Sequence, residues 1–187
     1  MKISTIYPLF FSLLVILACQ QPAPKQDETS ASSEAETFDQ AAEQAAIMAV
    51  IESETKCFFE RDYDCWKQHW IHEDYACQAW NNADGTFDAA VGWEAINQQG
   101  KSYIEDVPEG EEATSPPVIK RDGLQCKFYS NSLAYLLWKQ YGSTDGKSWT
   151  TSQEVRIMEK RDGAWKIVNV SAFWDNVNKI PADSLGV

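Results

Sequence analysis

The chain has 187 residues, of which 28 are Asp or Glu and 16 are Lys or Arg, so its formal net charge is −12. A surface this acidic repels phosphate groups, which argues against nucleic-acid binding and against electrostatic docking on anionic lipid. Aromatic residues make up 12% of the chain and include 8 Trp, whereas there are only 2 His. The composition predicts a well-packed core, and the length suits a single domain.

The first residues are typical of an export signal. Lys2 precedes an apolar run from Leu9 to Leu17, which is too short to span a bilayer as a helix. The run ends in Ile16-Leu17-Ala18-Cys19, which resembles the lipobox of bacterial lipoproteins. The resemblance implies removal of residues 1–18 and a lipid-modified Cys19 that anchors the protein in a membrane of the cell envelope. An ordinary signal peptide cleaved elsewhere is the alternative.

The residues after the cysteine indicate a cellular location and a tether. In proteobacterial lipoproteins a residue other than Asp at this position implies the outer membrane, so Gln20 favours it over the inner membrane, and whether the domain faces the periplasm or the cell surface stays open. Residues 19–36 are rich in Gln, Pro, Ala, Ser and Glu and lack aromatic residues, which predicts a disordered tether. We expect the globular domain to comprise residues 37–187.

Two helices are predicted at the start of the domain. Thr37-Phe38-Asp39-Gln40 has the form of a capping box and opens a helix that ends near Glu60. Asp62 caps a second, shorter helix that ends before Asp74. The i, i+4 spacing would place two indole rings on one face of this helix, those of Trp66 and Trp70.

The rest of the domain is predicted to be mainly β-structure. A hairpin with strands at 76–80 and 86–91 precedes a third helix from Trp93 to Ile104. The pattern then changes to period two, with turns that contain Gly and Asp. It predicts four strands, at 118–129 with a break near Asp122-Gly123, 133–141, 148–160 and 164–173. Helices followed by an antiparallel meander indicate an α+β domain.

Four cysteines follow Cys19, in a compartment where disulfides form. Two bridges among four cysteines allow three connectivities, and the sequence does not choose among them. If bridges exist, a pair across the first helix-helix turn is favoured; free buried thiols are the alternative. The four are Cys57, Cys65, Cys77 and Cys126, and the first two flank that turn.

The order of elements resembles the cone-shaped fold of nuclear transport factor 2, ketosteroid isomerase and the polyketide cyclase SnoaL. The most specific segment is Glu154 to Val168, in which Asp162-Gly163 makes the turn and Trp165-Lys166-Ile167 begins the last strand, as in the closing hairpin of SnoaL-like domains. The resemblance covers about residues 40–175. It implies three N-terminal helices packed on a curved, mostly antiparallel sheet, with a conical pocket between them. This fold hosts enzymes, ligand binders and oligomerisation modules, so it does not decide the function.

Strand alternation selects the side chains expected to face that pocket. Lysine prefers water, so the faces opposite Lys139 and Lys166 are assigned to the interior. The expected wall is aromatic with neutral amides, and it lacks the strand histidine of many SnoaL-like relatives, which favours binding of a small apolar or aromatic molecule over catalysis. The alternative is that these residues fill the core. The expected pocket residues are Trp70, Trp93, Tyr103, Trp138, Gln140, Gln153, Asn169 and Ser171.

The helices offer two candidates for proton transfer. His69 lies on the predicted second helix three residues before His72, and histidine titrates near neutrality. Glu54 falls on the apolar stripe of the first helix, so it either faces the pocket with a raised pKa or lies at the margin of the stripe and reaches water. The alternative is that both histidines are exposed at a helix end without a catalytic role. No third strong ligand accompanies them, so neither a metal nor a cofactor is expected.

The outward face of the predicted sheet is unusually apolar. Leu133, Tyr135, Leu137 and Tyr141 share it with Lys139, and Glu154 and Arg156 are expected on the same side of the sheet. A homodimer formed through this face would cover the apolar side chains.

We therefore expect an envelope lipoprotein whose domain binds a small apolar or aromatic molecule without catalysis. The alternative from another class is a lyase or isomerase of the ketosteroid-isomerase or SnoaL type, which works by proton transfer through His69 or Glu54. A third reading is a dimeric envelope module that binds a partner protein. The sequence does not identify a ligand.

Overall fold

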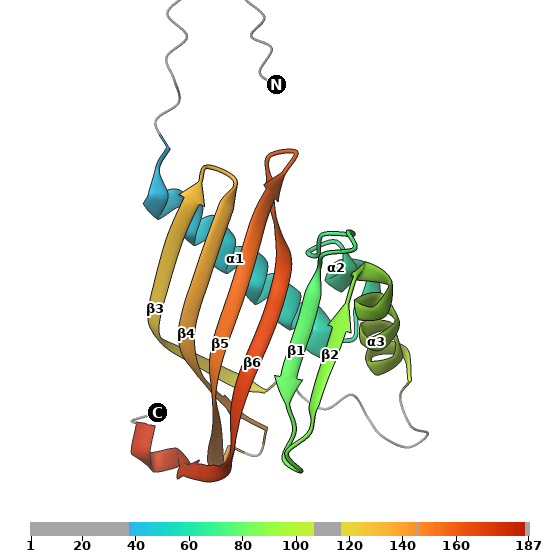
Figure 1. Cartoon of the computed structure of the whole chain (residues 1–187). Helices are drawn as coiled ribbons and strands as arrows, with labels where there is room; N and C mark the ends of the chain where they lie inside the picture. Colours follow the sequence, from blue (N-terminus) through green and yellow to red (C-terminus); the bar gives the residue numbers. More distant parts are fainter. Residues whose placement is uncertain (1–37, 107–116, 145, 186–187) are drawn as a thin grey trace, which may run out of the picture. The chain divides into compact units, whose positions relative to one another are not determined.

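The computed structural model describes residues 38–106, 117–144 and 146–185 (Figure 1). The chain divides into two units, Met1–Glu36 and Thr37–Val187, and all described residues belong to the second. The predicted signal peptide, Cys19 and the tether lie outside the described residues. No helix in the described part of the chain is long and apolar enough to cross a membrane.

Helix α1 spans Gln40–Phe59 and ends at Glu60, as predicted. Its N-cap is Asp39, whose carboxylate accepts hydrogen bonds from the backbone N–H groups of Ala41 and Ala42 at 3.0 and 3.1 Å. The helix lies diagonally across one face of the sheet (Figure 1). Its apolar stripe is buried against that face, through Ile47, Ile51 and Cys57.

Helix α2 is shorter than predicted and spans only Tyr63–Lys67, after the N-cap Asp62. The chain leaves the helix because its backbone pairs with the last strand instead. Ile167 N–H donates to the carbonyl of His69 at 2.8 Å, and Ile71 N–H donates to the carbonyl of Ile167 at 2.9 Å. His69 therefore lies in the turn that follows α2, and Trp70 forms a β-bridge with Ile167, so the prediction that both are helical is wrong.

In the described residues six strands form one sheet, in the order β2-β1-β6-β5-β4-β3. Every neighbouring pair is antiparallel except β1 and β6, which are parallel. With the helices packed on one face, this is the predicted α+β architecture, and β6 extends further than expected. The elements after α2 are β1 (Cys77–Asn81), β2 (Phe87–Val91), α3 (Trp93–Glu105), β3 (Val118–Ser130), β4 (Leu133–Ser143), β5 (Ser148–Arg161), β6 (Ala164–Pro181) and η1 (Ala182–Leu185).

A β-bulge in β6 changes which residues of that strand face the helices. Ile157 pairs with Asn169 and Met158 pairs with Ile167, so Val168 is an extra residue. The extra residue shifts the alternation by one position. The prediction that Asn169 and Ser171 face inward is therefore wrong. Beyond the bulge, the inward side chains are those of Val170, Ala172 and Trp174.

Strand β5 also presents the opposite face from the one predicted. Glu154 and Arg156 point toward the helices and are 1% and 8% exposed. Gln153 lies on the outer face, where its amide donates to the carbonyl of Trp138 at 2.7 Å. The prediction failed because the buried Glu154 and Arg156 pair with each other, while the apolar Val155 and Ile157 lie on the outer face. A prediction that places apolar side chains inside and charged ones outside therefore assigns the two faces of β5 in reverse.

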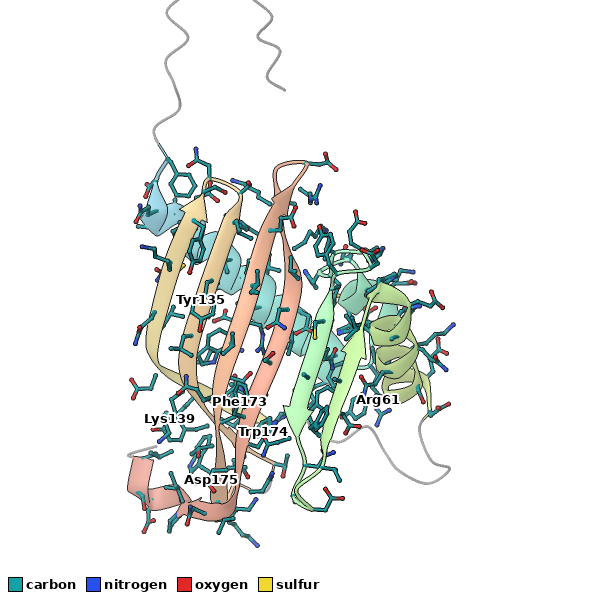
Figure 2. The ribbon with its side chains drawn as sticks, viewed as in Figure 1. Arg61, Tyr135, Lys139, Phe173, Trp174 and Asp175 are labelled. Atoms are coloured by element: carbon teal, nitrogen blue, oxygen red, sulfur yellow. A yellow bond between two sulfur atoms is a disulfide. The ribbon has the colours of Figure 1, made fainter. Side chains whose placement is uncertain are left out.

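Strand β4 follows the predicted alternation. Ala134, Leu136, Trp138 and Gln140 are buried, and the outward set includes Tyr135 and Lys139. Figure 2 looks onto this outer face, where Tyr135, Lys139 and Phe173 are labelled. Phe173 is 60% exposed and adds to the apolar character of the face.

The disulfide favoured by the sequence is present. Cys57 near the end of α1 is bonded to Cys65 in α2, and their Cα atoms are 5.6 Å apart. Cys77 and Cys126 are free thiols. The bridge fixes the turn between the two helices, and so helps to hold α2 against α1.

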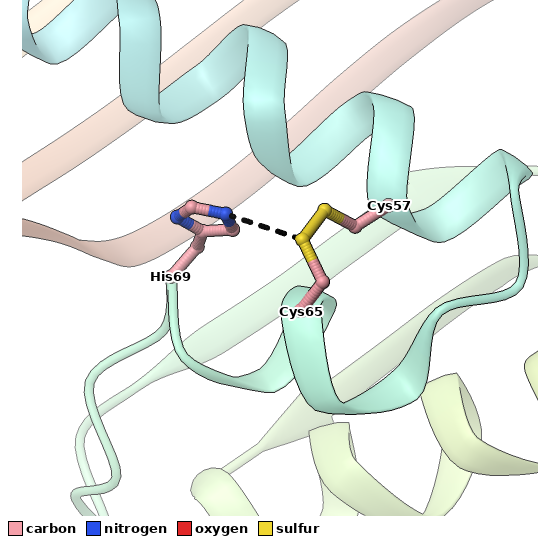
Figure 3. Close-up of side chains that lie close together, drawn as sticks. All are labelled: Cys57, Cys65 and His69. Atoms are coloured by element: carbon pink, nitrogen blue, oxygen red, sulfur yellow. Dashed lines mark hydrogen bonds between the residues drawn. A yellow bond between two sulfur atoms is a disulfide. The ribbon is translucent and has the colours of Figure 1, made fainter.

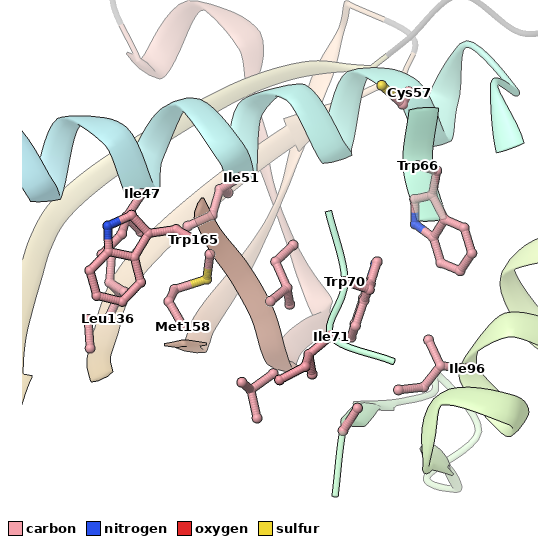
Figure 4. Packing of buried hydrophobic residues seen from close by; sticks show 14 of the residues in the cluster. Ile47, Ile51, Cys57, Trp66, Trp70, Ile71, Ile96, Leu136, Met158 and Trp165 are labelled. Atoms are coloured by element: carbon pink, nitrogen blue, oxygen red, sulfur yellow. The ribbon is translucent and has the colours of Figure 1, made fainter. Parts of the chain in front are cut away.

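The core contains an unusually close approach between Trp66 and α3. Trp66 is 1% exposed, and a Cβ atom added to Gly100 would overlap its indole ring. Figure 4 shows Trp66, Trp70 and Ile96 of α3 in the same hydrophobic cluster as Ile47, Ile51, Leu136 and Met158. Gly100 therefore permits α3 to pack against Trp66.

Replacing Gly100 with Ala separates helix propensity from packing. Propensity alone predicts that the change stabilises α3 by about 1 kcal/mol. We expect instead that overpacking against Trp66 destabilises the domain by about 1–3 kcal/mol, as measured by urea unfolding. Gly142→Ala is the matched control, because no atom lies within 4 Å of the added Cβ there. Equal stability of the two variants would contradict the packing argument.

Candidate functional site

A cavity of about 650 Å³ lies between the helices and the inner face of the sheet. This volume suits a small organic molecule. Rings from α1, α2, α3, β1 and β6 surround it, together with Trp70 of the segment after α2. They are Phe58, Phe59, Trp66, Trp70, Trp80, Tyr103 and Trp174.

Strand register arranges the polar side chains of the cavity wall. Trp80 of β1 lies beside Ala172 of β6, which lies beside Glu154 of β5. One position along the inner face, Val170 lies beside Arg156. Because Ala172 is small, it leaves space between the Trp80 ring and Glu154. The wall therefore combines an apolar, aromatic part with a charged part.

Glu54 enters the cavity from α1 and is held by two indoles. Trp66 Nε1 donates to Glu54 Oε1 at 2.9 Å, and Trp70 Nε1 donates to the same oxygen at 3.3 Å. Burial raises the pKa of Glu54, and the positive charge of Arg156 and the two indole hydrogen bonds oppose this rise only in part. The carboxyl group remains partly accessible from the cavity that it lines. The sequence left open whether Glu54 faces the pocket or reaches water at the margin of the apolar stripe, and in the structure it faces the pocket.

Glu154 and Arg156 form a buried pair opposite. Arg156 Nη1 donates to Glu154 Oε2 at 2.9 Å. Glu154 Oε1 accepts from Ser152 Oγ at 2.5 Å and from Gln140 Nε2 at 3.5 Å. The Arg156 guanidinium also lies 5.1 Å from the centre of the Trp138 ring. Both oxygens of Glu154 thus have partners within the protein.

The structure brings together only part of the predicted pocket. Trp70, Tyr103, Gln140 and Glu54 line the cavity. Trp93 instead stacks on His72, with ring centres 3.9 Å apart. Trp138 is 1% exposed and lies beneath Arg156 and Gln140. The other three predicted pocket residues, Gln153, Asn169 and Ser171, lie on the outer face of the sheet.

Among the cavity residues that sequence reasoning missed, four have an identifiable cause. Trp80 reaches the cavity wall because the predicted hairpin strand β1 pairs with β6, and no sequence signal indicates that parallel pairing. Trp174 lies beyond the predicted end of the last strand and after the bulge. The two charged residues, Glu154 and Arg156, were assigned to the wrong face of β5.

His69 lies outside this cavity, in a shallower hollow of about 600 Å³ with Gln68, Trp165 and Lys166. Burial lowers the pKa of His69, and Lys166 lowers it further. Figure 3 shows its ring beside the disulfide, with Nε2 4.0 Å from Cys65 Sγ. Ligand atoms of Cys57, Cys65 and His69 all lie within 4.8 Å of one another, but the disulfide bond occupies both sulfurs.

Comparison with known proteins defines the fold. No protein-family model and no curated protein matches the sequence. The structure is similar to that of LinA, with a TM-score of 0.54 and 16% identity over 75% of this chain and 90% of that chain. The structure is also similar to that of a nuclear transport factor 2-like protein of unknown function from Pseudomonas putida. The TM-score is 0.54 and the sequence identity 14%, over 73% of this chain and 88% of that chain. A third similar structure is that of a putative scytalone dehydratase from Novosphingobium aromaticivorans, with a TM-score of 0.52 and 12% identity over 75% of this chain and 87% of that chain. Likeness at these identities shows the fold alone.

The raised pKa of Glu54 makes the stability of the domain depend on pH. The folded state holds this proton more tightly than the unfolded chain does, so the stabilisation is complete below the ordinary glutamate pKa and is lost as pH rises through the folded pKa. The expected slope inside that window is about −1.4 kcal/mol per pH unit. The neutral amide of Glu54→Gln has no such slope.

The test is urea unfolding of the wild-type domain and of Glu54→Gln from about pH 4 to about pH 8. We expect the free energy of unfolding of the variant to rise relative to the wild type as pH increases. A difference that stays constant over this range would show that Glu54 titrates normally.

Proposed function

We propose that this domain, which has the nuclear transport factor 2-like fold, binds a small, largely apolar or aromatic molecule in the cavity. The observation that carries the proposal is the set of indoles around the cavity, those of Trp66, Trp70, Trp80 and Trp174. Indole faces stack on flat apolar ligands and lose little conformational entropy in doing so. In the described part of the chain, neither Trp80 nor Trp174 stacks on another aromatic ring. No other aromatic ring there competes with a ligand for their faces.

A neutral aromatic probe, 3-ethylindole, tests the binding proposal. We expect Trp174→Leu to weaken its binding about tenfold in isothermal titration calorimetry, because one stacking face is lost. Trp149→Leu is the matched control, since Trp149 is buried but does not line the cavity. No binding to the wild-type domain, or equal losses in both variants, would contradict the proposal.

Glu54 favours a second candidate function, proton transfer of the isomerase or lyase type. A carboxylate whose pKa is raised by burial is a stronger base than an exposed one, and Glu54 is oriented by its two indole donors. Of the two residues expected to act this way, His69 does not line the cavity, so Glu54 carries this candidate.

The probe for this candidate is 5-nitrobenzisoxazole. A base removes its C–H proton, the electron pair forms the nitrile, and the N–O bond breaks to release a coloured phenolate. We expect Glu54→Gln to lower the rate about a hundredfold, and the wild-type rate to rise with pH as Glu54 loses its proton. Glu60→Gln, an exposed glutamate at the end of α1, is the control. An unchanged rate in Glu54→Gln would exclude this role.

We also propose that Cys19 carries lipid and anchors the chain in the cell envelope, the outer membrane being favoured, and that the outer sheet face forms a homodimer. The apolar side chains on that face support the second part: Leu133 and Phe173 are exposed, and Tyr135 lies two residues from Leu133 on the same face of β4. We expect Tyr135→Glu to halve the apparent mass of the domain in size-exclusion chromatography. A wild-type domain that elutes as a monomer would contradict the dimer.

A further inference from the structure

We propose that the preferred ligand is an organic cation, an aromatic or apolar molecule that carries an ammonium group and pairs it with Glu54. This inference rests on the proposed binding function and specifies the ligand class. It follows from three features of the cavity: a carboxylate that forms no ion pair, neighbouring charged groups that have partners elsewhere, and the rings around that carboxylate.

Glu54 is a buried carboxylate that lacks a counter-ion. Among the described residues, no lysine or arginine nitrogen lies within 4.0 Å of its oxygens. Arg156, the positive charge that acts most strongly on Glu54, is already paired with Glu154 at 2.9 Å. Both indole donors bind the same oxygen, Oε1, so Oε2 keeps its capacity to accept from a ligand. A buried carboxylate with one open oxygen is completed by a positively charged donor.

The other charged groups near Glu54 have partners elsewhere. Glu154 and Arg156 of β5 pair with each other, and Arg121 of β3, which also attracts Glu54, lies 3.9 Å from the exposed Glu52 of α1. From α3 the cavity receives Gln99, Gly100 and Tyr103, which are neutral. Lys179 of β6 lines the cavity, but it is solvent-exposed and donates to Thr150 Oγ1 at 2.7 Å. An ammonium group beside Glu54 would therefore give its carboxylate a direct ion pair that none of these groups supplies.

The surroundings of Glu54 are those of an ammonium site. Phe58 lies one helical turn further along α1, and the two indoles that bind the carboxylate also line the cavity. Ring faces attract cations, by up to about 2 kcal/mol when water is excluded. The net charge of the chain, −12, also raises the local concentration of cations near the domain. An anionic ligand would meet repulsion from each of these features.

Three indoles that differ only in their side-chain charge test the inference. Tryptamine is a cation, 3-ethylindole is neutral and indole-3-propionate is an anion at neutral pH. We expect calorimetry on the intact domain to show tryptamine binding at least about tenfold more tightly than 3-ethylindole, and indole-3-propionate more weakly than either. Glu54→Gln should abolish the preference for tryptamine, and Glu60→Gln should retain it.

Proton release gives a second measurement that needs no variant. Below the raised pKa of Glu54 the empty site holds a proton, which an ammonium ligand must displace. Titration of the wild-type domain with tryptamine in two buffers of different ionisation enthalpy should show release of up to one proton, and titration with 3-ethylindole none. Absence of proton release at every pH from about 5 to about 8 would overturn the inference.

The outcomes separate the inference from the function on which it rests. If none of the three probes binds, the proposed binding function fails as well. If 3-ethylindole binds and tryptamine binds no more tightly, the cation inference is wrong while the binding function stands. If tryptamine is preferred equally by the wild type and by Glu54→Gln, the ammonium group is bound elsewhere and the assignment to Glu54 is wrong.

Discussion

The cavity is organised by the two hydrogen bonds that Trp66 and Trp70 donate to Glu54. Glu54 lies on α1, Trp66 on α2, and Trp70 on the segment that pairs with β6, so a single carboxylate joins three parts of the domain. Trp66 in turn sets how closely α3 approaches, through Gly100. Without the carboxylate, two buried indole N–H groups would lose their partner, at a cost of about 1–3 kcal/mol each. The walls of the cavity are therefore positioned by a group that also offers chemistry to its interior.

The two functions considered for the cavity use the same property of Glu54. Burial without a counter-ion makes the carboxyl group hold its proton more tightly, and the open oxygen faces the cavity. A ligand with an ammonium group would supply the missing charge, and a substrate with an acidic C–H bond would give up a proton to the same oxygen. The opposite wall contributes little to either role, because Glu154 is saturated by Ser152, Gln140 and Arg156. The position of Glu54 is thus the main determinant of function.

The sequence predicted the helices, the hairpin and the four long strands well, because capping residues, turn glycines and hydrophobic periodicity are local signals. It failed where the outcome depends on tertiary pairing. The extra residue at Val168 reverses the faces of β6 and brings Trp174 into the cavity, and no local pattern marks it. Pairing with Ile167 likewise ends α2 early and carries Trp70 off the helix. Buried charges that satisfy one another, as Glu154 and Arg156 do, make an inner face resemble an outer one.

Direct titration of Glu54 tests the central claim. The carboxyl carbon of each glutamate can be followed by NMR as a function of pH, together with the indole N–H protons of Trp66 and Trp70. The account predicts that the Glu54 signal titrates with a midpoint well above the ordinary value of 4.5, and that both indole protons shift at the same midpoint. A midpoint at or below 4.5, or indole protons that do not respond, would contradict it.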